Sequence, residues 1–290
     1  MSSLLVTGAN GQLGSELREL TSKYPSYNFI FTDIEELNIT DHNLVEQFIV
    51  VNNINIIINC AAYTAVDKAE SEVKISDNLN HLAVMNFARI AKIHQIKLIH
   101  ISTDYVFDGN TFKPIIETDT PNPQSVYGKT KWDGEKAMQI INPANSIIIR
   151  TSWVYSSFGK NFVKTMLKHG KERVFLNVID DQVGTPTYAS DLAKIILEVI
   201  PQINTTEVEL YHYSNEGVCS WYDFAKAIFE EKKINCKVNP ISTDKYPTVA
   251  KRPHFSLLNK NKIKSSFNIE IPYWKDSLKN CLLKLSMNKS

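Results

Sequence analysis

Two side chains four residues apart, Tyr127 and Lys131, form the pair in this sequence that is best suited to chemistry. At this spacing in a helix, the two side chains project from one face. A free phenol titrates near ~10, and an ammonium group beside it favours the phenolate and lowers its pKa, so the pair could transfer protons near neutral pH. The same spacing also arises where a packed tyrosine lies beside a solvated lysine. The rest of the chain has to decide between the two interpretations.

The chain opens with a pattern that is typical of dinucleotide binding. A buried strand predicted over residues 3–7 runs into Gly8, Gly11 and Gly14, and a helical pattern follows at once. Glycines allow a sharp turn and a close approach to phosphate, and the helix N-terminus offers free N–H groups to a pyrophosphate. We therefore predict that this loop holds the phosphates of a dinucleotide.

The second predicted strand, over residues 28–33, ends in a carboxylate. Asp33 lies nineteen positions after Gly14, where a group that binds the cofactor ribose is expected. Glu35 and Glu36 follow, and no Lys or Arg stands in this stretch. Because three carboxylates would repel a 2′-phosphate, the segment favours NADH, with use of NADPH left open. A solvated loop explains the two glutamates equally well.

Predicted strands alternate with helices through five repeats up to about residue 150. This alternation predicts a Rossmann-type doubly wound parallel sheet, with residues 1–155 as the dinucleotide-binding domain. The alternation loosens afterwards, and we expect residues 156–290 to form a smaller C-terminal α/β domain that mainly binds the substrate. A long, interrupted helix is expected over 66–91. Thr103 and Asp104 follow the fourth strand, at the edge where such sheets bind ligands.

Composition excludes several other classes of protein. With 32 basic and 31 acidic residues, the net charge of +1 gives no electrostatic case for binding nucleic acid or an anionic membrane. No apolar run is long enough to span a bilayer and no signal peptide is apparent, which predicts a cytoplasmic protein. The four cysteines show no C-x-x-C spacing, so we expect reduced packing residues and no metal site built from them.

Six motifs in register resemble those of the extended short-chain dehydrogenase/reductases, and more narrowly those of the dTDP-4-dehydrorhamnose reductases. They are Gly8-x-x-Gly11-x-x-Gly14, Cys60 to Glu70, Ser102 to Gly109, Tyr127 to Lys131, Arg150 to Tyr155 and Asp181 to Pro186. The likeness runs from Leu4 to at least Ser256. It implies an NAD(P)H-dependent oxidoreductase that reduces the C4 ketone of a nucleotide-linked 4-keto-6-deoxysugar, converting dTDP-4-dehydro-L-rhamnose to dTDP-L-rhamnose for surface polysaccharides such as lipopolysaccharide O-antigen.

The resemblance also implies three sets of site residues. The catalytic set is Thr103, Tyr127 and Lys131. The cofactor set is Gly8, Gly11, Gln12, Leu13, Gly14, Asp33, Asn38, Ile39, Ala62, Tyr63 and Thr64, together with Tyr127 and Lys131. The substrate set is Val66, Thr103, Asp104, Trp153, Asn161 and Arg252. Asn38 and Ile39 stand where the family usually has an acidic residue near the adenine, so the chain departs from the pattern there.

In the mechanism that the resemblance implies, the nicotinamide supplies a hydride to carbon and Tyr127 a proton to oxygen. Lys131 would lower the pKa of the phenol and hold the ribose hydroxyls, while Thr103 would donate a hydrogen bond to the carbonyl oxygen as negative charge builds on it. Some relatives bind magnesium between subunits through glutamates. Glu16 matches one such position, but Ser190-Asp191 is not a clean match for another. The sequence therefore leaves both a magnesium ion and a homodimer open.

Three other functions remain to be weighed. A dehydratase would need a carboxylic acid directly after Asp104, where this chain has Tyr105. A C4 epimerase tends to carry a different motif at this strand end. A non-catalytic relative serves as a regulatory subunit of methionine adenosyltransferase, and the intact catalytic set favours an enzyme instead. The exact sugar, the base and the face of the ketone that receives hydride stay open.

Overall fold

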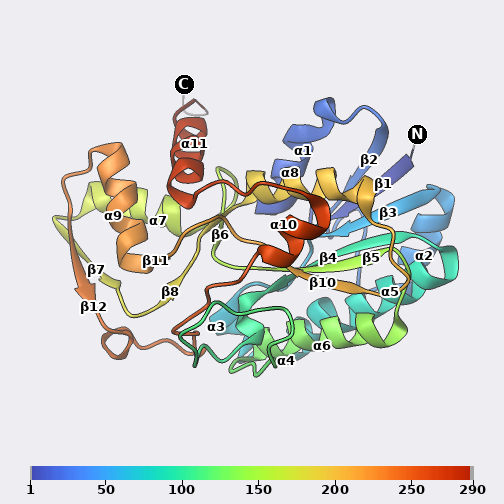
Figure 1. Cartoon of the computed structure of the whole chain (residues 1–290), viewed down its shortest axis with the longest axis horizontal. Coiled ribbons are helices and arrows are strands. Elements are labelled where there is room, and N and C mark those ends of the chain that lie inside the picture. Colours follow the sequence, from blue (N-terminus) through green and yellow to red (C-terminus); the bar gives the residue numbers. More distant parts are fainter. Residues whose placement is uncertain (1, 288–290) are drawn as a thin grey trace.

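The computed structural model describes residues 2–287, and a six-stranded parallel sheet lies at its centre (Figure 1). The strands follow the order β10-β5-β4-β3-β1-β2. Their bounds are β1 (Ser2–Thr7), β2 (Tyr27–Thr32), β3 (Ile54–Asn59), β4 (Lys97–Thr103), β5 (Ser146–Thr151) and β10 (Glu209–His212). The chain passes from β1 to β2 on one side and then to β3 on the other, so the order reverses at β1. A reversal of this kind opens a crevice at the carboxyl ends of the strands.

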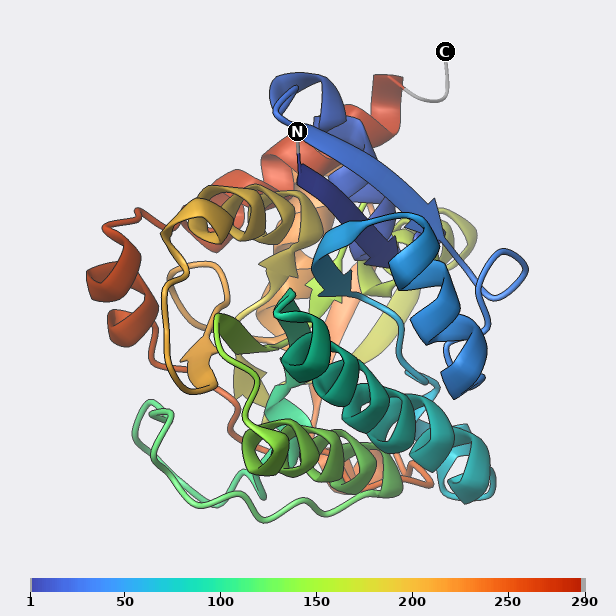
Figure 2. The same ribbon diagram turned by 90° about the vertical axis from the view of Figure 1, so that its right-hand side faces the viewer.

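Helices cover both faces of this sheet (Figures 1 and 2). One face packs on α1 (Gln12–Leu20), α8 (Ala189–Val199) and α10 (Asn261–Phe267), and the other on α2 (His42–Val51), α5 (Ala83–His94) and α6 (Val126–Ile141). Side chains of a strand alternate between the faces, so Leu4 and Val6 join the first core and Leu5 the second. Because both faces are buried, the strands read as continuous apolar runs, and the predicted doubly wound fold is confirmed.

The helix expected over residues 66–91 is interrupted, as predicted. It consists of α3 (Val66–Ala69), α4 (Val73–Asp77), a π-helical turn (Asn78–Leu82) and α5. The π-helical turn widens the helix where it passes α6: a Cβ added to Gly134 of α6 would lie 2.2 Å from the backbone oxygen of Asn80. Only glycine fits this contact, which brings the two helices together beside the predicted cofactor loop.

A second core lies at the other end of the molecule (Figure 1). Its elements are β6 (Val154–Tyr155), α7 (Phe162–Glu172), β7 (Phe175–Ile179), β8 (Val183–Gly184), β9 (Thr187–Tyr188), β11 (Cys219–Ser220), α9 (Trp221–Lys232), β12 (Lys237–Ile241) and α11 (Trp274–Met287). Phe224 and Phe229 of α9 are buried in it. Between these elements in sequence, α8 and β10 return to the main sheet, so the sheet draws on residues from both sides of position 155 and the two-domain division there stays a prediction.

All four cysteines are free thiols, and three of them are buried. Over the described part of the chain, no helix combines the length and the apolar character needed to cross a membrane.

Candidate functional site

The glycine-rich loop between β1 and α1 packs directly on the backbone that follows β3. Gly8 has a φ of +64°, and a Cβ on it would lie 2.7 Å from the backbone nitrogen of Ala61. A Cβ on Gly14 would lie 2.6 Å from the Cα of Ala9. Gly11 precedes α1 and no side chain caps this helix N-terminus. The loop therefore leaves the first N–H groups of α1 open to an anion such as a pyrophosphate.

Asp33 lies just after β2 and its carboxylate reaches back to the glycine-rich loop. Its Oδ2 accepts a hydrogen bond from the backbone of Asn10 (2.9 Å), and its own backbone N–H donates to Glu36 (2.8 Å). Glu36 therefore closes a turn here. A cation also approaches β2: the guanidinium of Arg18 lies 4.3 Å from the ring centroid of Phe31. Arg18 lies on α1, outside the stretch around Asp33, so this guanidinium was not expected from the sequence.

Asn38 and Ile39 differ in what they can offer an adenine. Ile39 is buried, whereas Asn38 is exposed and its Oδ1 accepts hydrogen bonds from the backbone (3.1 Å) and the hydroxyl (2.8 Å) of Thr40. Asn38 thus closes its own turn in this structure. Its contact with the cofactor stays a prediction.

Gln12 and Asn161 join the glycine-rich loop to the second core. The Nδ2 of Asn161 donates to the Oε1 of Gln12 (2.9 Å) and to the backbone oxygen of Ser156 (2.7 Å). The Oδ1 of Asn161 accepts from the backbone of Lys164 and so caps α7. Asn161 is placed beside the predicted phosphate loop, although most of its amide hydrogen bonds are made within the protein. Leu13, next to Gln12, is buried in the core under the sheet.

The loop of Ala62, Tyr63 and Thr64 is held by a residue that the sequence analysis did not identify. Asn80, in the π-helical turn, accepts from the backbone N–H of Tyr63 (2.9 Å) and donates to its carbonyl oxygen (3.1 Å). It also donates to the hydroxyl of Thr130 on α6 (3.2 Å). π-Helical turns are frequent at functional sites. The available signal was weak: Asn80 stands one turn after Ser76, to which it also donates a hydrogen bond (3.3 Å).

Tyr127 and Lys131 lie in the first two turns of α6, which Ser125 caps by accepting from the backbone of Gly128 (3.1 Å). Lys131 is only 2% exposed, and its Nζ donates to the backbone oxygen of Ile101 at 2.5 Å. A solvated lysine beside a packed tyrosine, the alternative raised by the spacing alone, is therefore excluded.

The two groups are shifted in opposite directions by burial. Burial raises the pKa of Tyr127 to about 12, with Asp104 adding to the rise and the Thr103 hydroxyl opposing it. Burial lowers the pKa of Lys131 to about 8, against the effect of Glu135. The expected lowering of the Tyr127 pKa by Lys131 is not observed, because the lysine Nζ is directed at a backbone carbonyl and desolvation dominates. At neutral pH the phenol is protonated, as a proton donor must be.

The end of β4 delivers three polar side chains to the same place. Asp104 is 2% exposed, and its Oδ1 accepts from the Thr103 hydroxyl (3.1 Å). Burial raises the pKa of Asp104 to about 6, against the opposing effects of the Ser256 and Thr103 hydroxyls, and within residues 2–287 its Oδ2 makes no hydrogen bond of full geometry. Tyr105 packs its ring edge-on against Tyr127, with centroids 5.4 Å apart. This carboxylate oxygen, next to Tyr105 and Tyr127, is suited to accept a hydrogen bond from a ligand hydroxyl.

The remaining predicted substrate residues lie on other elements, and their convergence on this point stays a prediction. Trp153, with a φ of +49°, stacks on Trp221 with ring centroids 3.7 Å apart. Arg252 forms an ion pair with Asp67 (2.7 Å), the residue after Val66 at the start of α3. The electrostatic influence of Arg252 also reaches Tyr105, the neighbour of Tyr127.

Glu16, the one matched position for magnesium, is fully buried and already paired. Its Oε1 accepts from the Ser156 hydroxyl (2.6 Å), and its Oε2 forms an ion pair with the Nζ of Lys284 (2.8 Å). Asp191 accepts hydrogen bonds from Asn215 and Ser277. Within residues 2–287, no group of three or more His, Cys, Asp or Glu side chains could hold a metal ion. Because an ammonium already neutralises Glu16, the residues present do not fit a magnesium site.

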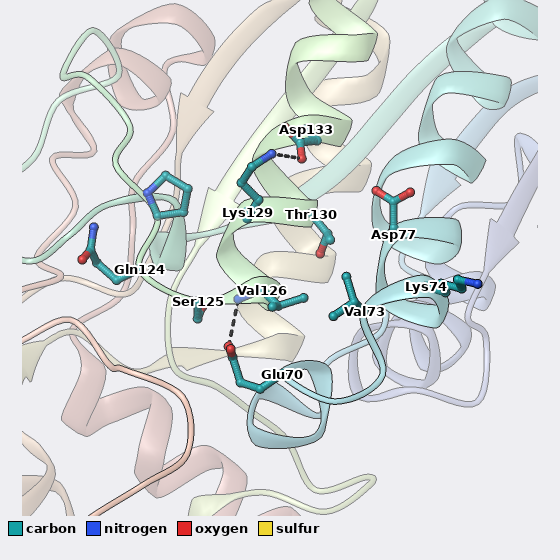
Figure 3. A pocket seen from close by; sticks show the side chains of 11 residues that line it. Glu70, Val73, Lys74, Asp77, Gln124, Ser125, Val126, Lys129, Thr130 and Asp133 are labelled. Atoms are coloured by element: carbon teal, nitrogen blue, oxygen red, sulfur yellow. Dashed lines mark hydrogen bonds and ion pairs between the residues drawn. The ribbon is translucent and has the colours of Figure 1, made fainter.

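A surface pocket of about 520 Å³ lies between α4 and the first turns of α6 (Figure 3). Val126, Lys129 and Asp133 line it, on a different side of the helix from Tyr127 and Lys131. The pocket mixes apolar side chains with charges of both signs, and none of the predicted site residues lines it.

Comparisons with known proteins identify the family of this chain. The family model described as the RmlD substrate binding domain matches residues 1–287. A dTDP-4-dehydrorhamnose reductase of Aggregatibacter actinomycetemcomitans is 43% identical, covering 97% of this chain and 98% of the relative. A spore coat polysaccharide biosynthesis protein of Bacillus subtilis is 37% identical, with 97% of each chain covered. The crystal structure of a dTDP-4-dehydrorhamnose reductase from Bacillus anthracis in complex with NADP has a TM-score of 0.92 and 37% identity, covering 98% of this chain and 100% of the other. The chain therefore belongs to the dTDP-4-dehydrorhamnose reductase family.

Proposed function

We propose that this protein reduces the C4 ketone of dTDP-4-dehydro-L-rhamnose to give dTDP-L-rhamnose, as part of surface polysaccharide synthesis. One observation carries the proposal: Tyr127 lies beside Thr103 and Asp104 at the carboxyl edge of the sheet, with the buried Lys131 one helical turn away. The names of the relatives supply the substrate, and the name of the Bacillus subtilis relative supports the role in polysaccharides.

The residues that would hold a nicotinamide cofactor lie on both sides of the switch in strand order. The N-terminus of α1 and Gln12 would hold the pyrophosphate and Asp33 the adenosine ribose, with the loop from Ala62 to Thr64 along the other half. Lys131 would hydrogen-bond the nicotinamide ribose. When bound, the cofactor supplies the hydride. The predicted cofactor loops are held by Asn80 and by the packing of Gly8, which supports a binding surface that is formed before the cofactor binds.

The chain supplies the proton and orients the ketone. The Thr103 hydroxyl donates to the Oδ1 of Asp104 in this structure, and with substrate bound it would turn to donate to the C4 oxygen as charge builds there. Tyr127 would transfer its phenolic proton to that oxygen. Burial keeps the phenol protonated at neutral pH, so the donor is ready before hydride transfer. The free Oδ2 of Asp104 would accept a hydrogen bond from a sugar hydroxyl. Trp153 and Val66 would flank the sugar, and Asn161 and Arg252 would contact the diphosphate.

We further propose that NADH is preferred, because Asp33, Glu35 and Glu36 put three carboxylates into the stretch that follows β2, although Glu36 itself closes a turn with Asp33. The NADP complex of the Bacillus anthracis relative and the nearby Arg18 both argue for measuring this directly. We expect a higher kcat/KM with NADH than with NADPH. Asp33→Ala should shift the ratio toward NADPH, and Arg18→Ala should shift it further toward NADH. A clear advantage for NADPH in the wild-type protein would contradict the preference.

The activity is tested by following NADH oxidation with dTDP-4-dehydro-L-rhamnose made in the assay by a 3,5-epimerase. Product identity is checked by NMR of the isolated sugar nucleotide, which also shows the face that received hydride. A panel of other nucleotide-linked 4-keto-6-deoxysugars serves as the comparison. Turnover confined to another member of the panel would reassign the substrate. Tight NADH binding with no turnover of any ketosugar would favour a non-catalytic regulatory subunit instead.

A further inference from the structure

A line of buried polar side chains crosses three neighbouring strands and ends at Lys131. Thr7 closes β1, Asn59 closes β3, and the strand register pairs Thr7 with Asn59 and Asn59 with His100 of β4. The Thr7 hydroxyl donates to the Oδ1 of Asn59 (2.8 Å), the Nδ2 of Asn59 lies 3.2 Å from the Nδ1 of His100, and the Nε2 of His100 lies 3.4 Å from the Nζ of Lys131. All four side chains are at most 2% exposed, so water does not relieve any mismatch along the line.

The direction of the hydrogen bonds is set at one end. The backbone N–H of Ala61 donates to the Oδ1 of Asn59 (3.2 Å), and a backbone amide cannot reverse its role. The amide oxygen of Asn59 is therefore committed, and its Nδ2 has to donate to the Nδ1 of His100. A neutral imidazole that accepts at Nδ1 carries its proton on Nε2. The Nε2–H of His100 then faces the Nζ of Lys131.

A charged lysine has three donors and no acceptor, so it cannot accept the hydrogen bond that this tautomer offers. We propose that His100 is a positioning residue for the Tyr127–Lys131 pair: by presenting Nε2–H to Nζ, it disfavours the ammonium form of Lys131. The neutral amine, in contrast, can accept this hydrogen bond. The proposal rests on the proposed function for its consequence in catalysis, but the hydrogen-bond direction can be measured without turnover.

The other groups around Lys131 do not have this effect. Glu135, one turn further along α6, favours the ammonium form but is bound to Arg150 (2.6 Å). Desolvation raises the pKa of the partly buried Cys60, so its thiol is neutral near pH 7, and Tyr127 is a neutral phenol there. The carbonyl of Ile101 accepts from either form of Nζ. Besides burial itself, His100 is thus the neighbour that opposes the charge, and burial together with Lys131 lowers the pKa of its own ring far below the usual value.

A single substitution should reverse the direction of the hydrogen bonds from Asn59 to Lys131. In Asn59→Asp both carboxylate oxygens accept, so the Nδ1 of His100 becomes the donor and its bare Nε2 can accept from the lysine ammonium. We expect the pH at which Lys131 loses its proton to rise by about one unit, since one hydrogen bond to a charged group is worth about that much. His100→Gln keeps the original direction, because its oxygen accepts from Asn59 and its NH₂ faces Lys131, and it should titrate like the wild-type protein.

Two controls separate this effect from a simple change in charge. Thr7→Val removes one donor but leaves Ala61 to fix Asn59, so it should leave the titration unchanged. Adding Asn59→Asp to a His100→Leu background keeps the new carboxylate but breaks the line. Any rise in the Lys131 titration that persists in this double variant is due to through-space attraction between the new carboxylate and the ammonium. It should be clearly smaller than the rise seen with His100 present.

The experiment combines two readouts on the full chain. Lysine labelled with ¹³C at Cε, assigned with Lys131→Met, gives the titration of Lys131 by NMR, and ¹⁵N-labelled histidine, assigned with His100→Gln, shows which ring nitrogen carries the proton. We expect Nε2–H in the wild-type protein, Nδ1–H in Asn59→Asp, and an alkaline limb of kcat/KM that moves with the lysine titration. Nδ1–H in the wild-type protein, or equal shifts with and without His100, would overturn the proposal. Absence of turnover would count against the proposed function alone, because both NMR readouts need no substrate.

Discussion

The guanidinium of Arg252 forms a bidentate ion pair with the carboxylate of Asp67, and the two residues are 185 positions apart in the chain. Nη1 donates to Oδ1 (3.2 Å) and Nη2 to Oδ2 (2.7 Å), while Nη1 also donates to the backbone oxygen of Ala250 (3.1 Å). Hydrogen bonding to Arg252 in turn lowers the pKa of Asp67. Within the described part of the chain, no residue accepts from Nε. The second edge of the guanidinium, formed by Nε and Nη2, is therefore still able to bind an oxyanion while Asp67 fixes the first.

This geometry makes Arg252 the candidate to test for the diphosphate. We expect Arg252→Ala to raise the KM for the sugar nucleotide about 10- to 100-fold, the usual effect of losing a charge-assisted hydrogen bond, and to leave NADH binding unchanged. Asp67→Asn keeps the arginine but orients it less firmly, so a smaller rise is expected. Steady-state kinetics together with NADH titration by fluorescence measure both. An unchanged KM in Arg252→Ala would show that the ion pair with Asp67 is purely structural and that Arg252 does not bind the diphosphate.

Removing one oxygen tests the proton donor. Tyr127→Phe should lower kcat by ~10² to 10⁴-fold with little change in cofactor affinity, because the phenol acts mainly in the transition state. Lys131→Met should lower kcat and also weaken NADH binding, since the lysine is assigned to both tasks. The control is Tyr222, an α9 tyrosine that packs against the second core: Tyr222→Phe should behave like the wild-type protein. Wild-type rates in Tyr127→Phe would place the proton donor elsewhere.

The parallel sheet was predictable because each of its strands is marked by residues that are close together in the sequence. Each strand is a short apolar run, and glycines or small polar residues mark its end, so the alternation of elements shows in the sequence. Gly8 illustrates this: its place after the first strand predicted the loop that the structure contains. By contrast, α8 and β10 return to the sheet from beyond residue 155, and nothing in their own sequence tells which core they join.

The site was less predictable wherever its geometry depends on contacts between distant segments. Asn80 acts through hydrogen bonds to residues 17 and 50 positions away. The guanidinium of Arg18 approaches Phe31 of β2 from α1. The direction of the Tyr127 pKa shift was missed for a related reason. Spacing placed the lysine on the correct side of the helix, but burial and the Ile101 carbonyl, neither visible in the motif, decide the outcome.

The buried ion pair of Glu16 and Lys284 ties α11 to the helix that follows the glycine-rich loop. Lys284→Met would leave the carboxylate buried without a cation, and we expect a loss of about 3 kcal/mol in unfolding free energy, the lower end for a broken buried pair since Lys284 is a quarter exposed. Glu16→Gln with Lys284→Met should be less destabilised than Lys284→Met alone. Denaturant unfolding measures the stability of the wild-type protein and of both variants.

Because the Lys284 ammonium already neutralises Glu16, a chelator such as EDTA should leave wild-type activity unchanged. A loss of activity that magnesium restores would contradict this.

The Asp104 carboxylate should lower the stability of the fold while supporting activity. Its raised pKa sets how stability changes with pH. Burial raises the pKa of this carboxyl from 3.8 to about 6, so only well below pH 3.8 is it neutral in both the folded and the unfolded chain. As the pH rises toward 6, the unfolded chain ionises first, and the folded state loses stability. At pH 7.5 the buried carboxylate is charged and destabilising. Asp104→Asn should therefore be more stable than the wild-type protein at pH 7.5, by roughly 1 to 3 kcal/mol, and should lose most of this advantage near pH 4.

The same substitution should reduce catalysis, because the free Oδ2 accepts best when ionised. We expect kcat/KM of the wild-type protein to fall below about pH 6 as Asp104 takes up a proton, and the Asn variant to be about tenfold slower at pH 7.5 without that acidic limb. Asp108 provides a matched control on the same loop, since a backbone hydrogen bond from Asn110 lowers its pKa. Asp108→Asn should therefore destabilise the protein at neutral pH while keeping the acidic limb. If Asp104→Asn were less stable than the wild-type protein at pH 7.5, the carboxylate would have a stabilising partner and could not be the group reserved for substrate.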